Sequence, residues 1–484
     1  MGRAPQSADP AIALAHHVAR ARPATLPVAT RIATCRDILD TLGCMLGGSG
    51  APGIETLVGL ARRWGGRGEA SVLCTDARVP AHHAALANGA MAHALDFDDT
   101  HDLAGNIHPG APVLAAALAA AELRGTVAGD EFVLAVALGL DVACRVALGA
   151  CEDRGWHRTA AMGVFGAAAA ASRLLGLTSE QVVHAFGIAL SQAAGTRQCI
   201  DDGALTKRFQ AGQAASAGVL SAVLAGEGFT GAREVFTGRY GFLPMYQPGR
   251  FDGAALVAGL GETWEGDRVS LKPWPCFRPA HAAIDAALGL REELALAKGG
   301  AAEIAGVTLA SDPRAHADQF EAGAHKRQPR HVIESQFATP FLVATALLRG
   351  HVRIADVAQP DDEGVLALAN LIEGQRVEGS PPGWARLTVV TTDGRSATRE
   401  VARAAGSPDH PLSDTALDAK FRDCAANAVR PIAAATVDAA IAFVRGLPQQ
   451  QDAAALLRLL TRALTPARSA RGPAGCTGSR RARG

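Results

Sequence analysis

Runs of alanine and other small apolar residues fill the first half of this chain and limit what it can fold into. Two of them, Ala81–His93 and Pro112–Leu123, contain few bulky side chains. Hydrophobic residues make up 48% of the chain but aromatic residues only 5%, so a core must be built mainly from alanine, leucine and valine. Alanine has the highest helix propensity and lets helix axes approach closely. The sequence therefore predicts closely packed helices from Asp9 to about Leu260.

The helical pattern is interrupted once and then resumes. A chain of 484 residues exceeds what one hydrophobic core usually supports, which predicts two or three domains. Near Pro273 the composition changes, and β-branched runs at 304–310 and 385–392 enclose expected helices at 340–349 and 361–373. Helical periodicity returns at 414–444 and 452–464. We predict a mainly α protein whose two chain ends form a large all-helical domain around a smaller α+β domain. The expected bounds are 1–267, 268–404 and 405–465, followed by a disordered arginine- and glycine-rich tail at 466–484.

Charge and cysteine content narrow the function classes. Lysine plus arginine and aspartate plus glutamate both number 47, and this balance argues against a nucleic-acid or membrane-surface partner. Nine cysteines occur without a C-x-x-C pair, which indicates reduced thiols rather than a zinc framework or a disulfide scaffold. No signal peptide and no uninterrupted apolar run of about 18 residues is found. We expect a soluble cytoplasmic protein.

The most polar segment joins the two alanine-rich helices. Residues 94–101 (ALDFDDTH) and 102–110 (DLAGNIHPG) place four carboxylates, a hydroxyl and two imidazoles in one turn-rich junction. Such junctions bring side chains and free backbone groups at helix ends to a ligand. The pattern predicts a functional site. The alternative is a helix cap followed by a solvated acidic loop.

Two adjacent cations, Lys207 and Arg208, stand at the start of a helix expected at 211–225. Cations at a helix N-terminus oppose the helix dipole, so this arrangement indicates a compensating anion. That anion is either a ligand or one of the nearby carboxylates, Asp201 or Asp202.

A proline-stiffened segment, Ser270–Asp285, delivers Lys272, Arg278 and His281 toward a helix start. Proline lowers the entropy lost on ordering, which suits a segment that holds side chains for a ligand. A rigid domain linker with a buried histidine is the alternative. His157, in the sequence Gly-Trp-His-Arg, is a further candidate for an anion contact.

Metal and nucleotide motifs do not occur. The chain contains no H-E-x-x-H, Walker loop or G-x-G-x-x-G. His82, His83 and His93 fit no metal triad and are interpreted as structural. We expect neither a metal nor another cofactor.

Taken together, several short motifs resemble the MmgE/PrpD family from about residue 10 to 460. They are DTLG at 40–43, ANGA at 87–90, HALDFDDTH at 93–101, HPG at 108–110, GWH at 155–157, GALTKR at 203–208, KPWPC at 272–276 and AHAAID at 280–285. The family includes 2-methylcitrate dehydratase, cis-aconitate decarboxylase and iminodisuccinate epimerase. The resemblance implies an all-helical domain with an α+β lid, a homodimer, no metal, and an active site in the cleft between domains. It also implies that the catalytic residues are Asp96, Thr100, His108, Lys207 and His281.

The residue types agree with this chemistry. Dehydration, decarboxylation and epimerisation of small polycarboxylates all pass through a carboxylate-stabilised carbanion, which requires fixed cations and a proton shuttle. We expect substrate binding by four residues, namely Arg208, Arg278, His157 and Lys272. The resulting hypothesis is a lyase, a dehydratase or decarboxylase acting on a small di- or tricarboxylate. The alternatives are an epimerase of a succinate-like acid and a catalytically silent helical interaction protein.

Overall fold

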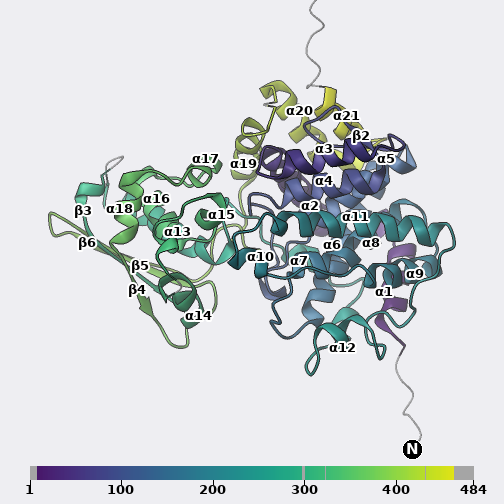
Figure 1. The fold of residues 1–484 in the computed structure, drawn as a ribbon, viewed down its shortest axis with the longest axis horizontal. Helices are drawn as coiled ribbons and strands as arrows, with labels where there is room; N and C mark the ends of the chain where they lie inside the picture. The colour runs from purple at the N-terminus through teal and green to yellow at the C-terminus, as the bar shows by residue number, and fades with distance from the viewer. Residues whose placement is uncertain (1–7, 297–299, 322, 431, 463–484) are drawn as a thin grey trace, which may run out of the picture.

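The structure, a computed structural model, describes residues 8–296, 300–321, 323–430 and 432–462. The chain forms two lobes of unequal size, and the larger lobe consists almost entirely of helices (Figure 1). Its helices are α1 (Pro10–Arg20), α2 (Val28–Gly48), α3 (Ile54–Trp64), α4 (Ala81–Ala92), α5 (Gly110–Arg124), α6 (Gly129–Gly149), α7 (Arg158–Ala161), α8 (Gly163–Leu174), α9 (Ser179–Leu190), α10 (Gln198–Asp201), α11 (Thr206–Gly226), α12 (Phe242–Tyr246), α19 (Asp414–Ala426), α20 (Ala434–Arg445) and α21 (Ala455–Arg462). A short antiparallel pair, β1 (Ala70–Ser71) with β2 (Arg78–Val79), lies among them.

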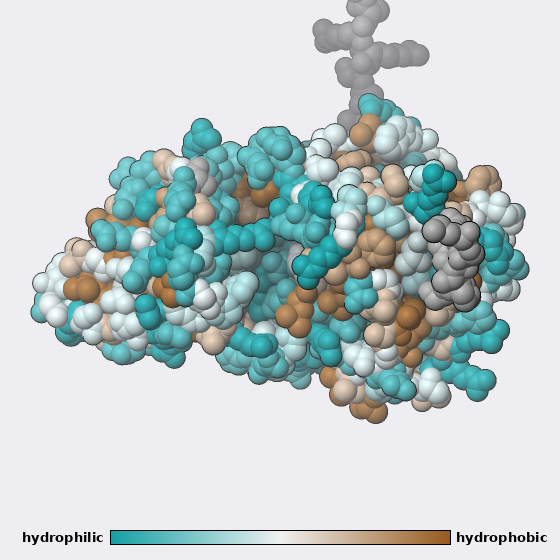
Figure 2. Space-filling model, turned by 90° about the horizontal axis from the view of Figure 1, so that it is seen from below, coloured by the Kyte–Doolittle hydropathy of each residue, from teal (hydrophilic) through white to brown (hydrophobic). Residues whose placement is uncertain are grey.

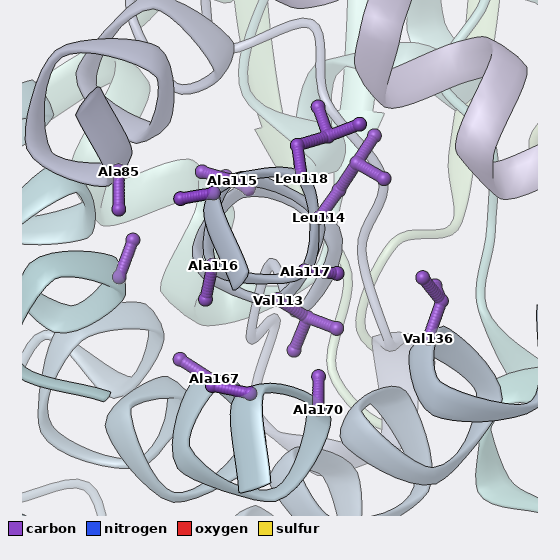
Figure 3. Close-up of a cluster of buried hydrophobic side chains, with 14 of the residues drawn as sticks. Ala85, Val113, Leu114, Ala115, Ala116, Ala117, Leu118, Val136, Ala167 and Ala170 are labelled. Carbon is purple, nitrogen blue, oxygen red and sulfur yellow. The ribbon is translucent and has the colours of Figure 1, made fainter. Parts of the chain in front are cut away.

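Small apolar side chains build the core of the larger lobe, as the composition predicts. Residues 110–121 of α5 are all buried, and α5 lies surrounded by neighbouring helices (Figure 3). This hydrophobic cluster draws residues from 11 to 271 and again from 417 to 460. Both ends of the described chain therefore contribute to one core.

The smaller lobe has a separate core that draws residues from 276 to 404. Its mixed sheet has the strand order β4-β3-β5-β6, with β3 parallel to β4 and the other pairs antiparallel. The strands are β3 (Ile304–Ser311), β4 (Ile372–Arg376), β5 (Ala385–Thr391) and β6 (Ser396–Val401), and the helices are α13 (His281–Glu293), α14 (Pro313–His316), α15 (Val332–Gln336), α16 (Thr339–Arg349), α17 (Ile354–Ala358) and α18 (Glu363–Asn370). Alternate residues of β5 are buried, which matches the two-residue period of a strand.

The bounds of several predicted elements differ from those in the structure. The helix expected at 361–373 ends at Asn370, and its last residues begin β4. The polar sequence of β4 gives little strand signal, because it pairs at the sheet edge and most of it stays solvent-accessible. The helix expected at 211–225 begins earlier, at Thr206, so Lys207 and Arg208 lie inside its first turn. The domain bounds stay predictions, and the tail expected at 466–484 lies outside the described residues.

One helix among the described residues, α6, is long and apolar enough to span a membrane. Ninety-four per cent of its most apolar window is buried inside the protein. A core helix of a large helical lobe has the same properties.

A close backbone contact between α4 and α11 positions the residues of the site. A side-chain carbon at Gly212 would lie 2.2 Å from the carbonyl oxygen of Leu86, and one at Gly89 would lie 3.0 Å from the Cα of Gly212. Only glycine permits this backbone approach. The first turn of α11 is thereby held against the segment that follows α4, where the acidic motif begins.

Candidate active site

The acidic segment leaves α4 through a sharp turn that is fixed from two sides. Asp96 has a positive φ of 52°, a conformation that is uncommon for residues other than glycine. Lys272 donates a hydrogen bond to the carbonyl oxygen of Asp96 (2.7 Å), and Lys420 donates to that of Phe97 (2.7 Å). Thr100 then pairs with Ser270 through both backbone hydrogen bonds. The segment is thus held by residues that follow it by more than 160 positions.

Two lysines converge on the carboxylate of Asp96. The Nζ of Lys207 lies 2.9 Å from Asp96 Oδ1, and that of Lys272 lies 3.5 Å from the same oxygen. Lys207 also donates to His93 Nε2 over 2.8 Å. All these side chains are buried, and Lys207 and His108 are the most accessible members of the cluster, at 8% and 9%.

Burial and neighbouring charge set the ionisation of the cluster. Burial opposes ionisation of Asp96, but the charges of Lys207 and Lys272 outweigh it and hold the pKa of this carboxyl well below its usual range. Burial, reinforced by the same two cations, lowers the pKa of His93 well below its usual range. The pKa of His108 is lowered in the same way by burial and Lys272. At neutral pH the site therefore combines fixed cations with neutral imidazoles.

Three imidazoles stand beside the lysines. His93 Nδ1 lies 2.7 Å from Asp98 Oδ2, and its Nε2 lies 3.3 Å from Nε2 of His157. His108 lies edge-on to His93 with a ring separation of 4.8 Å, and its Nε2 is 3.9 Å from Asp96 Oδ1. Its Nδ1 has no hydrogen-bond partner among the described residues. His108 is thus the imidazole whose nitrogens are least engaged by the protein.

The structure brings together five of the nine predicted site residues: Asp96, His108, Lys207, His157 and Lys272. Lys207 pairs with Asp96, and not with Asp201 or Asp202, the partners considered from sequence. Lys272 is fully buried with its Nζ on the backbone of Asp96, so the structure places it behind Asp96 rather than at an open surface.

Thr100 and His281 are buried, and within the described part of the chain neither side chain makes a hydrogen bond or an ion pair with this cluster. Thr100 Oγ1 and His281 Nδ1 have no hydrogen-bond partner in the described chain, while His281 Nε2 faces the carbonyl oxygen of Cys276 (3.2 Å). Burial lowers the pKa of His281, and the charges of Arg278 and Lys272 add to this effect. His281 therefore lies within electrostatic reach of Lys272.

The two predicted arginines serve other contacts. Arg278 pairs with Asp102 (3.2 Å) and donates to the carbonyl oxygen of Ala405 (2.8 Å), which ties the smaller lobe to the acidic segment. Arg208 donates to the carbonyl oxygen of Pro52 (3.0 Å), and burial lowers its pKa to about 10. In this structure both guanidinium groups lie outside hydrogen-bond distance of the Asp96 cluster.

A second layer of buried carboxyls lies behind the site. Lys420 of α19 donates to Asp40 Oδ1 (2.6 Å) on α2 and to the carbonyl oxygens of Phe97 and Lys272. Asp99 accepts the backbone N–H of Gly110 at the start of α5. Burial, and then the charge of Asp40, raises the pKa of Asp37 well above its usual range. This layer supports the turn from which the site residues project.

The fold brings together four side chains that could bind a metal ion, and their spacing in the sequence did not indicate this set. His93, Asp96, Asp98 and His108 offer one atom each within 4.8 Å of one another, an arrangement that can hold a metal ion. However, the ammonium of Lys207 lies within 2.9 Å of both His93 and Asp96. The ammonium of Lys207 therefore already places a positive charge beside the potential ligand atoms of His93 and Asp96.

Sequence reasoning gave His93 no role in the site, and it included Asp98 only as one carboxylate of the acidic segment. His93 was interpreted as a structural histidine of the alanine-rich helix, but it is the cap residue of α4 and turns into the cluster. The available signal was its position, five residues before Asp98 in the same turn-rich motif. The face shown in Figure 2 is hollowed between the lobes, and hydrophilic residues lie inside the hollow while hydrophobic residues border part of it.

Comparisons with known proteins agree with this architecture. The model of the MmgE/PrpD N-terminal domain matches residues 12–253, and that of the MmgE/PrpD C-terminal domain matches residues 274–443. A cis-aconitate decarboxylase-like protein, oryM of Aspergillus oryzae, is 28% identical over 443 residues, which cover 86% of this chain and 90% of that protein. The cis-aconitate decarboxylase of Aspergillus terreus is 26% identical (87% and 90% covered), and that of Homo sapiens is 27% identical (82% and 83% covered).

Proposed function

This chain belongs to the MmgE/PrpD family, and from that premise we propose that it is a cofactor-independent acid–base lyase that decarboxylates an unsaturated tricarboxylate of the cis-aconitate class. One observation carries the proposal. Lys207 and His108, the most accessible members of a buried cluster, flank the same carboxylate, Asp96. A fixed cation beside a weakly engaged imidazole is what carbanion chemistry on a carboxylate requires.

The cations stabilise the charge that develops. When the bond to the departing carboxylate breaks, carbon dioxide leaves and the electron pair passes onto the remaining carbon skeleton, next to a second carboxylate. Lys207 pairs with that carboxylate, and Lys272 adds its charge from behind Asp96. In a buried site these charges act more strongly than they would in water.

His108 moves the proton. The His108 imidazole, neutral at rest, takes up one solvent proton as the anionic substrate binds and then gives that proton to the carbanion, so each turnover consumes one solvent proton. A low pKa favours rapid donation because the protonated form is a strong acid. Thr100 and His281, whose free polar atoms are buried, complete the substrate contacts when the lobes close on a ligand.

The test is a product analysis of the purified protein by NMR in deuterated water. The acids are cis-aconitate, 2-methylcitrate and a succinate-type amino or imino acid. We expect carbon dioxide release from cis-aconitate with deuterium at the newly protonated carbon. If the protein instead removes water from 2-methylcitrate to form an alkene, it is a dehydratase and not a decarboxylase.

Two variants make the outcome specific. His108→Gln should abolish turnover, while His83→Gln, which changes a histidine of α4 outside the cluster, should leave it unchanged. Deuterium incorporation without loss of carbon dioxide or water would indicate an epimerase. No change in any acid would contradict the enzymatic proposal and favour a silent helical protein.

A further inference from the structure

The segment that leads into His108 is a short closed loop. The backbone N–H of His101 donates to the carbonyl oxygen of Ile107 (2.9 Å), so residues 101–107 close on themselves directly before His108. Leu103, within the loop, is 75% exposed. The bridge between the two ends fixes the shape of the loop but not its place in the molecule. The position of His108 therefore depends on what the loop contacts.

One side of the loop rests on the guanidinium group of Arg158. This group donates to the carbonyl oxygen of Ala104 in the loop (3.4 Å) and to those of Ala147 and Ala150 at the end of α6 (2.9 Å each). Gly105 has a φ of 69°, and a side-chain carbon there would lie 2.6 Å from the guanidinium carbon. Glycine thus lets the guanidinium pack directly against the loop backbone. Carbonyl groups at a helix C-terminus lack partners within the helix and favour a cation, so Arg158 joins the loop to a fixed point on α6.

The next residue, Thr159, holds His108 directly. Thr159 Oγ1 accepts a hydrogen bond from the backbone N–H of His108 (3.1 Å). Thr159 is 1% exposed, so solvent does not replace this acceptor when it is lost. A buried N–H without an acceptor is costly, and the backbone shifts to find another one. The hydroxyl of Thr159 therefore fixes the point from which the His108 imidazole projects toward Asp96 and His93.

The residue before Arg158 belongs to the site itself. His157 lies against His93, with their Nε2 atoms 3.3 Å apart, and its backbone N–H donates to the carbonyl oxygen of Gly195 (3.0 Å). Three consecutive residues, 157–159, thus contact the imidazole cluster, the loop and the backbone of His108 in turn. Arg158 and Thr159 have no role in the reaction proposed above.

We propose that Arg158 and Thr159 are positioning residues that set the place of the His108 imidazole beside Asp96. Each acts through the backbone, Arg158 through the carbonyl group of Ala104 and Thr159 through the N–H of His108. A displacement of about 1 Å at a reacting group can lower a rate about a hundredfold. The consequence for turnover rests on the proposed acid–base function, while the contacts themselves are independent of it.

The first experiment measures the loop without requiring activity. Hydrogen exchange of the full-length protein is followed by mass spectrometry in peptides that span residues 101–110. Thr159→Val removes the acceptor but keeps nearly the same side-chain shape, and Arg158→Lys leaves a single ammonium that cannot bridge the loop and α6. We expect exchange in these peptides to be about tenfold faster or more in both variants, because backbone N–H groups of the segment lose protection.

A matched control comes from the smaller lobe. Thr345 is also 1% exposed, but its hydroxyl bonds within α16, to the carbonyl oxygen of Phe341 (2.8 Å). Thr345→Val should leave exchange in the loop peptides unchanged. Exchange in Thr159→Val and Arg158→Lys that is as slow as in the wild type would overturn the proposal.

The second experiment measures turnover of cis-aconitate. Thr159→Val should lower kcat about tenfold to a hundredfold while KM changes less than about threefold, because the cations that bind the substrate stay in place. Thr159→Ser keeps the acceptor, so its kcat should return to within about threefold of the wild type. Thr345→Val should match the wild type. Normal kcat in Thr159→Val, or a serine variant as slow as the valine variant, would overturn the positioning role.

Together the two experiments separate this inference from the proposed function. If the wild type is inactive on every acid but exchange in the loop is faster in both variants, the proposed function fails and the positioning contacts stand. If the wild type is active and Thr159→Val keeps a normal kcat, the proposed function stands and the positioning role fails.

Discussion

Replacing Lys420 by methionine should cost the folded protein about 4 kcal/mol, because one ammonium satisfies three buried acceptors. Its Nζ lies 2.6 Å from Asp40 Oδ1, 2.7 Å from the carbonyl oxygen of Phe97 and 2.9 Å from that of Lys272. It also lies 4.0 Å from the centre of the Phe97 ring. Removing one partner of a buried ion pair typically costs about 3–5 kcal/mol. The carbonyl groups of Phe97 and Lys272 lose their hydrogen-bond donor, which adds to this cost. Protonation of Asp40 reduces the cost in part, because burial already raises the pKa of this carboxyl.

The assay is thermal unfolding followed by circular dichroism at neutral pH. About 4 kcal/mol corresponds to a fall in Tm of roughly 6 °C for a lobe of about 300 residues. A matched control lies on the same helix: Arg422 pairs with Asp438 at 2.9 Å, but both side chains are at least half exposed. Arg422→Met should change stability by less than about 1 kcal/mol.

A double variant distinguishes the ion pair from simple loss of packing. In Asp40→Leu with Lys420→Met, no buried charge is left unpaired at this position, so at least half of the lost stability should return. The reasoning would be refuted if Lys420→Met cost no more than Arg422→Met, or if the double variant were less stable than the single one.

Three further outcomes follow from the site and its surroundings. Lys207→Met should reduce kcat/KM about a hundredfold to a thousandfold, because it removes a cation from the site. It should also lower the Tm, because it leaves the buried Asp96 without its nearest cation. Unchanged stability with normal turnover would contradict both the catalytic and the stabilising role of Lys207. Asp37→Asn should stabilise the protein, and the gain should increase as pH rises above the usual pKa range of an aspartate, because the raised pKa of Asp37 means that its ionisation opposes folding. Denaturation midpoints of the wild type and the variant, measured from pH 4 to pH 8, test this. A difference in stability that does not change with pH would count against it. EDTA should leave turnover intact, because Lys207 already provides a cation at two of the potential metal ligands, and activity lost to EDTA and restored by one divalent ion would show this to be wrong.

The sequence predicted what depends on local pattern. The alanine-rich runs become α4 and α5, and the β-branched runs become β3 and β5. These features follow from propensity and side-chain period, which neighbouring residues determine. Strand β4 was missed because its pairing with β3, and not its own composition, makes it a strand.

The site was predictable only as far as its residues lie in recognisable motifs. Asp96, His108 and Lys207 were found from motifs, but the contacts that join them to one another and to His93 were not. Lys420 is 380 residues from Asp40, and nothing in its surroundings in the sequence, DAKFRD, sets it apart from a surface lysine. Arg278 was expected from the sequence to bind the substrate, and the structure adds a contact that the sequence did not indicate, its ion pair with Asp102. Tertiary packing decides which charges meet.

The interrupted core has a consequence for the order in which the chain can fold. The smaller lobe draws its core from one continuous stretch, 276–404, so all its residues emerge from the ribosome together. The larger lobe cannot bury the face of α2 that packs on α19 until residues 414–426 have been made. Contacts of such long sequence separation close slowly, because the loop-closure entropy must be lost before they form. During synthesis Asp40 therefore remains without its cation until α19 has been made, and helices from the later part of the chain complete the core that the early helices begin.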